Sequence, residues 1–304
     1  MAIHSDKHKN PASSGKGLQS AFKLVVLVLG LIVTGTIVYY YKGAVPNPGF
    51  AATGTSVQPN IQYKYNYLPS STGEMIHHTY YSLSYREAHE QPEWVAYILT
   101  RKSLQAPNVS REKDFVPDGM VSTYSATPDD YRGSGYTRGH LVPAGDMAFD
   151  TLAMRETFLM SNISPQLRQL NNGIWRDLEE HVRDWAYKAD SLYVVSGPVL
   201  SNPVKKTGRK NKVTVPAAFY KVLLDNKGPE KKAIGFIIPH ELSEKRLETY
   251  MVAVSDVEAL TGLKFFEQMP NQAEILRLKS SIEPGKWQIS DKRYQLRVKK
   301  WNYE

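Results

Sequence analysis

Cysteine is absent from this chain of 304 residues, which excludes a disulfide framework, a thiolate zinc site and a cysteine nucleophile. The sequence also has no glycine-rich loop of the Rossmann or Walker type, so no motif indicates a nucleotide cofactor. No internal repeat is visible. With 41% hydrophobic residues the chain can still bury a large core, which an exported protein could do without disulfides.

Positive charge is limited once the N-terminal segment is set aside. The formal net charge is +8, but five lysines and one aspartate before residue 44 account for +4 of it. The remaining +4 suits a polyanionic substrate without arguing for one. Five cations between residues 205 and 212 predict a basic loop. Such a loop is more often simply exposed to solvent than involved in specific recognition, but it could contact phosphates.

Residues 24–41 are almost wholly apolar and approach the roughly 20 residues that a helix needs to cross a bilayer. Lysines precede this run, and three tyrosines with Lys42 follow it. The positive-inside rule then predicts a cytoplasmic segment at residues 1–23, a transmembrane anchor at residues 24–41 and an extracytoplasmic catalytic domain, periplasmic or outside. The alternative is a cleaved secretory signal ending at Ala51, which would give a secreted form, although the apolar run is long for one.

Residues 42–62 are rich in Pro, Gly, Ser, Thr and Asn, which predicts a flexible linker. A domain at residues 63–275 and a C-terminal extension at residues 276–304 complete the predicted organisation. Within the extension, apolar and basic residues alternate over residues 294–301, which indicates an edge strand or a basic tail.

Patterns of β-forming residues predict strands at residues 80–85, 94–99, 192–195, 213–224 and 233–238. Ile174, Leu178, Val182 and Trp185 recur at helical spacing, and a shorter helix is expected over residues 255–261, with Ser255 as its N-cap. Because strands and helices do not alternate regularly, the predicted class is α+β, with a mixed or antiparallel central sheet flanked by helices.

Two motifs carry the chemistry. His140 lies in the sequence YTRGHLVP, and an imidazole can accept a proton from water near neutral pH. About thirty residues later, Asn171 opens the predicted helix, where its oxygen could face Mg²⁺ or simply cap the helix. Glu179 follows eight residues on, slightly more than two turns away, so one helix would carry both oxygen groups on neighbouring faces. Together these residues favour metal-assisted phosphodiester hydrolysis.

The sequence resembles the DNA/RNA non-specific endonuclease family, which includes the endonuclease G-like enzymes and has a ββα-metal (His-Me finger) active site. The resemblance extends over most of residues 75–270. The matching segments are residues 91–97, 111–115, 134–144, 161–166, 196–199, 215–222 and 260–266.

The resemblance implies a role for each of the central residues. His140 would be the general base, Asn171 the direct ligand of a largely hydrated Mg²⁺, or Mn²⁺, and Glu179 would order metal-bound water. Arg111 and Arg183 would hold the scissile phosphate, for which the forked guanidinium is suited.

The resemblance also assigns Arg138 to motif support or phosphate contact, and Asn162 to a substrate-binding position. The products would carry 5′-phosphates, and DNA, RNA or both would be substrates without base specificity. One departure concerns Thr137, because the family motif usually has aspartate there. Threonine keeps a hydrogen bond but contributes no charge, which affects the pH preference of the base.

Two other functions are compatible with the sequence. One is a 5′-exonuclease or small-nucleotide phosphodiesterase of the same fold, since the shape of the groove decides between them. The other is a non-catalytic nucleic-acid-binding membrane protein, against which the combined presence of His140, Asn171, Glu179 and Arg111 argues. The sequence leaves the oligomeric state open, with a homodimer as one possibility.

Overall fold

The computed structural model describes residues 65–228 and 230–304. The predicted cytoplasmic segment, anchor and linker, residues 1–23, 24–41 and 42–62, lie outside this part of the chain. Within it, no helix is both long enough and apolar enough to cross a membrane. Residues from Tyr63 to Glu304 belong to one compact unit, so residues 276–304 are packed with the rest.

A seven-stranded sheet forms the centre of this unit, and every pair of neighbouring strands in it is antiparallel. The predicted α+β class is therefore confirmed, with an antiparallel sheet. In their order across the sheet, the strands are β1 (Glu74–His77), β2 (Tyr81–Arg86), β3 (Gln91–Thr100), β6 (Ser191–Pro198), β9 (Ala218–Asp225), β10 (Lys232–Pro239) and β11 (Met251–Val252).

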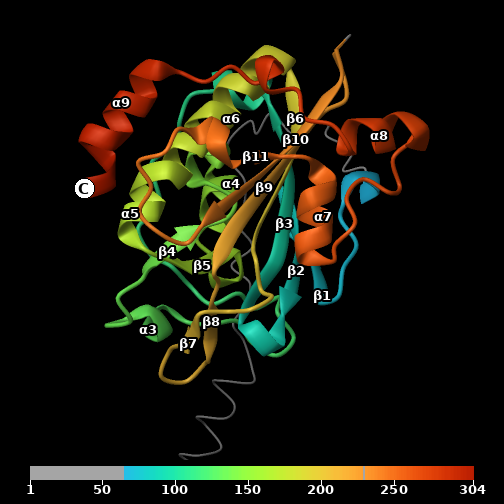
Figure 1. Ribbon diagram of the computed structural model, residues 1–304. Helices are drawn as coiled ribbons and strands as arrows, with labels where there is room; N and C mark the ends of the chain where they lie inside the picture. The colour runs from blue at the N-terminus through green and yellow to red at the C-terminus, as the bar shows by residue number, and fades with distance from the viewer. Residues whose placement is uncertain (1–64, 229) are drawn as a thin grey trace, which may run out of the picture. The chain divides into compact units, whose positions relative to one another are not determined.

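Helices cover both faces of the sheet, so that the unit has three layers (Figure 1). Alternate side chains of each strand enter two separate cores. In β3, for example, Val95 packs in the core beneath α6 (Arg176–Ala189), whereas Trp94 packs in the core beneath α7 (Val254–Thr261) and α8 (Gln272–Lys279). The other α-helices of the described residues are α2 (Arg101–Gln105), α3 (Pro128–Tyr131), α4 (Thr151–Glu156), α5 (Arg168–Leu170) and α9 (Asp291–Lys299).

The predicted strands are observed, with one division. The long run over residues 213–224 becomes β8 (Val213–Val215) and β9, because Pro216 has no N–H to continue a ladder. The helix over residues 174–185 is confirmed. The short helix is also present as α7, but its N-cap is Ala253, whose N–H donates to Asp256, so the prediction of a Ser255 cap was wrong.

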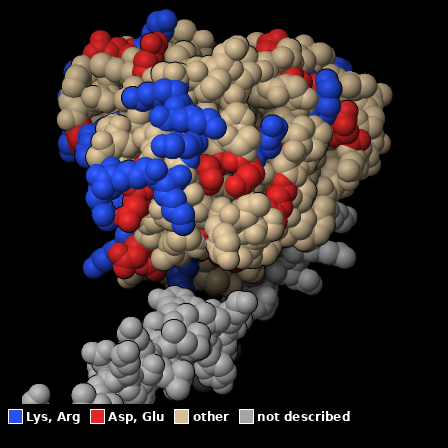
Figure 2. All heavy atoms as spheres, turned by 90° about the horizontal axis from the view of Figure 1, so that it is seen from below, with Lys and Arg blue, Asp and Glu red and all other residues tan. Residues whose placement is uncertain are grey.

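The predicted basic loop is an ordered hairpin of β7 (Lys205–Thr207) and β8. It lies beside α3 at one end of the molecule, and β4 (Thr137–His140) and β5 (Ile163–Gln166) lie between this end and the middle (Figure 1). Viewed from that end, Lys and Arg side chains gather on one side of the surface (Figure 2).

The prediction of an edge strand or basic tail at residues 294–301 was wrong. This stretch forms most of α9, and Trp301 and Asn302 after it are buried. Arg297 is fully buried, and its Nε lies 2.9 Å from a carboxylate oxygen of Asp177 in α6. The alternating pattern did not reveal this helix, because a buried basic residue with a carboxylate partner distant in sequence looks like an exposed one.

Candidate active site

Strands β4 and β5 pair with each other, and the chain then passes through α5 and a π-helical turn, Asn171–Trp175, into α6. Two side chains of the turn bind both ends of β4. The amide Nδ2 of Asn171 donates to the Thr137 hydroxyl at 3.0 Å, and Trp175 Nε1 donates to the His140 carbonyl at 3.3 Å. These contacts hold the turn along β4 and bring the two sequence motifs into one ββα unit.

Gly139 makes the close packing inside this unit possible. A Cβ atom at this position would lie 2.2 Å from the side chain of Gln166 on the paired strand. The Gln166 amide is fully buried, and neither its oxygen nor its nitrogen has a hydrogen-bond partner in the described residues. Since buried amides are nearly always paired, the two unpartnered atoms of Gln166 make the space beside β4 a candidate for a bound group.

The His140 ring lies between two aromatic rings, with its centroid 5.3 Å from that of Phe115 and 4.9 Å from that of Phe158. Two guanidinium groups cover these rings from outside. Arg138 is 4.3 Å from the centroid of Phe115, and Arg111 is 5.2 Å from that of Phe158. The structure thus brings together three of the predicted site residues in one aromatic and cationic cluster.

This cluster keeps His140 neutral. Burial, followed by the charges of Arg111 and Arg138, lowers the pKa of the imidazole from 6.5 to about 3. Its Nε2 atom is shielded from solvent and has no hydrogen-bond partner within residues 65–228 and 230–304. An anion bound to the two arginines would offset their charge and raise this pKa, so the ring would become a stronger base when such a ligand is present.

Asn171 is oriented by Thr137. The threonine hydroxyl accepts from the Asn171 amide and donates to the Gln166 carbonyl at 2.9 Å. Because this hydrogen bond uses the side-chain nitrogen of Asn171, the side-chain oxygen is left over, and no donor in the described residues binds it. The helical run starts before Asn171, at Arg168, so the alternative of an N-cap is wrong. Thr137 therefore supplies the hydrogen bond that positions the amide, without the charge of an aspartate.

Glu179 lies on α6, is partly buried and makes no hydrogen bond to the part of the chain that the structure describes. Its charged neighbours are Lys221, Arg183, Asp146 and Glu180, and burial is the largest influence on it, raising its pKa to about 7. Lys221 is fully buried, and its Nζ donates to the Ser196 hydroxyl and lies 4.7 Å from the centroid of the Trp175 ring. Burial lowers the pKa of this lysine to about 8.

Arg183 is committed to carboxylates. Its guanidinium binds Asp146 at 2.7 Å and Glu180 at 3.0 Å, and Asp146 also accepts from the buried Tyr97 hydroxyl at 2.6 Å. The side chain remains 21% exposed, so one edge can still face a ligand. The predicted phosphate contact therefore stays a prediction, whereas the structural role of Arg183 beside Glu179 is clear.

Asn162 is placed differently from the prediction of a substrate contact. It is fully buried, its oxygen accepts from the backbone N–H of Val142 at 2.8 Å, and its nitrogen donates to the carbonyls of Val142 and Thr157. Both ends of the amide are thus occupied by backbone just beyond His140. This arrangement supports the chain that follows β4 and leaves no free group for a substrate.

Sequence reasoning gave no role to three residues that complete the site: Gln166, Asp146 and Lys221. A signal existed for Lys221, because Phe219, Lys221 and Leu223 share one face of an otherwise apolar strand, and a lysine there must be buried. No comparable signal existed for Gln166 or Asp146, whose surroundings arise only from tertiary packing.

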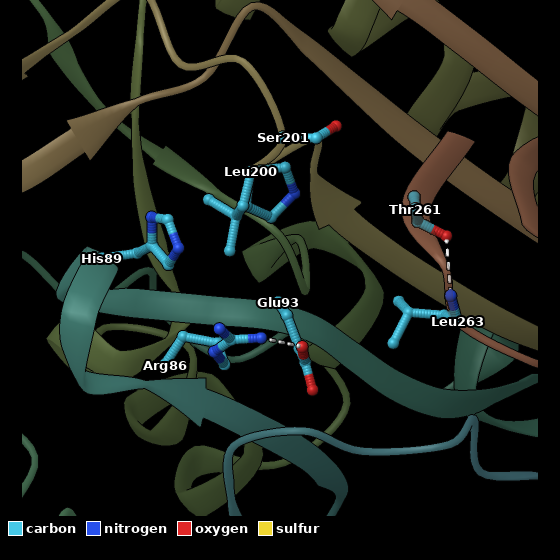
Figure 3. Close-up of a pocket in the computed structure, with 8 residues that line it drawn as sticks. Arg86, His89, Glu93, Leu200, Ser201, Thr261 and Leu263 are labelled. Carbon is cyan, nitrogen blue, oxygen red and sulfur yellow. Dashed lines mark hydrogen bonds and ion pairs between the residues drawn. The ribbon is translucent and has the colours of Figure 1, made fainter. Parts of the chain in front are cut away.

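A separate hollow of about 250 Å³ lies away from these residues, lined by side chains that include Arg86, His89 and Glu93 (Figure 3). Its polar groups are bound by the protein itself. Arg86 pairs with Glu93 at 3.1 Å, and His89 Nδ1 lies 3.0 Å from the Thr214 hydroxyl. The hollow therefore lacks the unpartnered groups found around His140.

The chain is similar in sequence to several known nucleases. The chain is 35% identical over 220 residues to the mitochondrial nuclease EXOG of Danio rerio, with 67% of this chain and 64% of that protein covered. It is 35% identical to nuclease C1 of Cunninghamella echinulata var. echinulata, covering 66% and 86%, and 32% identical to human mitochondrial endonuclease G, covering 60% and 66%. The chain spans about three fifths of the length of the EXOG relatives.

The fold is also similar to that of a solved chain from the crystal structure of the EndoG/EndoGI complex, which concerns the mechanism of EndoG inhibition. The match has a TM-score of 0.60 and 30% identity, over 66% of this chain and 88% of that one. The family model described as DNA/RNA non-specific endonuclease matches residues 58–272. The chain therefore belongs to the DNA/RNA non-specific endonuclease family, whose members typically use a divalent metal.

Proposed function

We propose that this protein is a metal-dependent, sequence-non-specific endonuclease of DNA, RNA or both, with His140 as the general base. The observation that carries the proposal is the neutral, unpartnered imidazole between Arg111 and Arg138, on the strand that also anchors Asn171. A base that is already deprotonated, beside two cations, is what attack on a phosphodiester anion requires.

The residues present fit a hydrated Mg²⁺ or Mn²⁺. Amide and carboxylate oxygens are the hard ligands that these cations prefer, and among the described residues no group of three or more His, Cys, Asp or Glu side chains forms a cage of protein ligands. Asn171 would hold the cation through its unpartnered oxygen, because Thr137 fixes its nitrogen. When bound, the cation would neutralise charge at the phosphate and the leaving oxygen.

The chain's own side chains perform the remaining tasks. Arg111 and Arg138 bind and orient the scissile phosphate, and this neutralises the charges that depress the pKa of His140. The imidazole then accepts a proton from the attacking water. Glu179, which the described protein leaves without a hydrogen bond, orders water molecules near Asn171.

The predicted products carry 5′-phosphate and 3′-hydroxyl ends. Base specificity is not expected, because guanidinium and amide contacts to the sugar–phosphate backbone carry no sequence information.

The test is digestion of circular and linear duplex DNA, single-stranded DNA and RNA, each with Mg²⁺, with Mn²⁺ and with a chelator. Cleavage of circular DNA that stops with the chelator supports a metal-dependent endonuclease. Cleavage of linear DNA alone would indicate the 5′-exonuclease alternative, and hydrolysis confined to small nucleotides would indicate a phosphodiesterase. Binding of nucleic acid without any cleavage would overturn the proposal in favour of a non-catalytic protein.

For the cellular location, we propose an anchor at residues 24–41 with the nuclease domain outside the cytoplasm, on the basis of the apolar run and its flanking charges. Protease treatment of intact cells tests this. Digestion of the nuclease domain with retention in the membrane fraction supports an uncleaved anchor, release into the medium indicates a cleaved signal, and full protection contradicts both.

A further inference from the structure

The hairpin of β7, β8 and the turn between them, here called the basic hairpin, carries a concentration of unneutralised positive charge. No acidic residue occurs in the sequence between Asp190 and Asp225. In the described chain, none of the five cations of the hairpin forms an ion pair with a carboxylate, and all five are exposed. They are Lys205, Lys206, Arg209, Lys210 and Lys212.

The turn of the basic hairpin is held in place from below. Asp130 of α3 accepts from the backbone N–H groups of Lys210 and Asn211 at 3.2 and 3.0 Å, and from the Asn211 amide at 2.8 Å. Gly208 has φ +98°, and a Cβ there would lie 2.1 Å from the Asn211 carbonyl, so only glycine fits. These contacts present the cations from a built turn, unlike the solvated excursion expected from sequence.

The basic hairpin shares its foundation with the active site. Val213 of β8 is buried in a small core that includes Ile163, the first residue of β5. At the surface, Lys205 Nζ lies 5.2 Å from the centroid of the Tyr136 ring, and Tyr136 directly precedes β4. The cations are thus rigidly connected to the strand that carries His140.

The spacing along β4 sets the distance between hairpin and base. A strand rises about 3.3 Å per residue, so Tyr136 lies roughly 13 Å from His140, about four nucleotide steps of a duplex at 3.4 Å each. A nucleic acid with its scissile phosphate at His140 and running along β4 would therefore meet Lys205 several nucleotides away. Seen from this end, Lys and Arg side chains gather on one side of the surface (Figure 2).

We propose that the basic hairpin binds the sugar–phosphate backbone of a long nucleic acid several nucleotides from the scissile bond, and so sets the affinity for long substrates without acting in cleavage. This inference rests on the proposed function, because it assumes that the scissile phosphate lies at His140. The basic hairpin would recognise the phosphate backbone of either single-stranded or double-stranded nucleic acid.

The experiment replaces Lys206, Arg209, Lys210 and Lys212 with glutamine in one variant. Binding to long single- and double-stranded DNA is measured without divalent metal over a range of salt concentrations, and kcat and KM are measured with Mg²⁺ on long duplex and on a dinucleotide. Weaker binding and a salt slope reduced by about one for each cation removed are expected. KM for the duplex should rise several-fold, with the dinucleotide values unchanged.

A matched control replaces four exposed cations on other elements and should leave all these values near wild type; they are Lys227, Arg277, Lys292 and Lys299. An unchanged salt slope in the hairpin variant would overturn the inference, as would an equal loss on the dinucleotide or an equal effect in the control. If the wild type cleaves nothing, the proposed function fails, while the metal-free binding data still decide whether the hairpin holds nucleic acid. A loss with only one strand form identifies which form the hairpin binds.

Discussion

His140 and Glu179 are both titratable groups of the site, but their surroundings are opposite in character. Aromatic rings and two cations surround the imidazole, whereas Glu179 lies among Lys221, Arg183 and two further carboxylates. Burial and the arginines lower the pKa of His140 to about 3, and burial raises that of Glu179 to about 7. In both cases the environment favours the neutral form.

This difference shows how one ββα unit can prepare two groups for different tasks. The imidazole is free of a proton before the substrate arrives, and the arginines that depress its pKa are also the groups that a phosphate would neutralise. Burial favours the protonated form of the carboxyl, and the neighbouring Lys221 and Arg183 oppose this effect. Environments that separate pKa values in this way are typical of acid and base pairs in active sites.

Removing the imidazole should have the largest effect. His140→Ala is expected to lower the rate of DNA cleavage by at least about 10²–10⁴-fold, the usual contribution of a general base, while circular dichroism shows the native fold. His77→Ala is the control, because His77 is an exposed residue of the edge strand β1, outside both the site and the basic hairpin, and it should retain activity. Near-normal turnover by purified His140→Ala would refute the assignment of the base.

A smaller loss of cleavage activity is expected when Glu179 is changed. Glu179→Gln keeps the size of the side chain but removes its charge, and cleavage should fall by about 10–100-fold, as for groups that support a metal site from outside. Glu180→Gln is the matched control on the next residue, where the carboxylate binds Arg183. Equal losses in the two variants would mean that net charge, and not the position of Glu179, matters.

Thr137 connects β4, the strand of His140, with Asn171 in the turn that leads into α6, the helix of Glu179. Replacing Thr137 should reduce activity less than either change above. Thr137→Val preserves shape but loses the hydrogen bond to Asn171, worth about 1 kcal/mol, so activity should fall roughly fivefold at limiting Mg²⁺. Thr137→Ser keeps the hydroxyl and should behave like the wild type. If saturating Mg²⁺ fails to restore the valine variant, the hydrogen bond does not act through metal affinity.

The smallest effects concern the pH dependence of stability, and they should have opposite directions. The stability that His140 contributes is lost as pH falls from 6.5 towards about 3. The melting temperature of His140→Gln minus that of the wild type should therefore be higher at pH 5 than at pH 8. The stability that Glu179 contributes is lost as pH rises from 4.5 through about 7. The melting temperature of Glu179→Gln minus that of the wild type should therefore be higher at pH 8 than at pH 5.

Each gain should be about 1 kcal/mol or more, equivalent to a shift of about 2–4 °C in a protein of this size. Thermal melts of the wild type and both variants at the two pH values provide the measurement. Shifts of the same sign in the two variants would contradict the contrast between their surroundings.

Much of the fold could be predicted from sequence because its signals are local. The continuous run of β-forming apolar residues in β3 and the helical spacing of Ile174, Leu178 and Val182 are local patterns of this kind. The C-terminal helix was missed because Arg297 is buried against Asp177, a partner about 120 residues earlier. Ser255 was wrongly predicted to be the N-cap because the helix begins earlier than expected, where Asp256 accepts a hydrogen bond from the N–H of Ala253.

The sequence by itself determined the chemical groups of the site: an imidazole, an amide and a carboxylate at fixed spacing, and two arginines. Tertiary structure alone decided how those groups are tuned. The aromatic rings around His140, the orientation of Asn171 by Thr137, and the electrostatic influence of the buried Lys221 on Glu179 each join segments distant in the chain. A pKa depends on desolvation and on neighbouring charge, and these exist only once the segments have packed together.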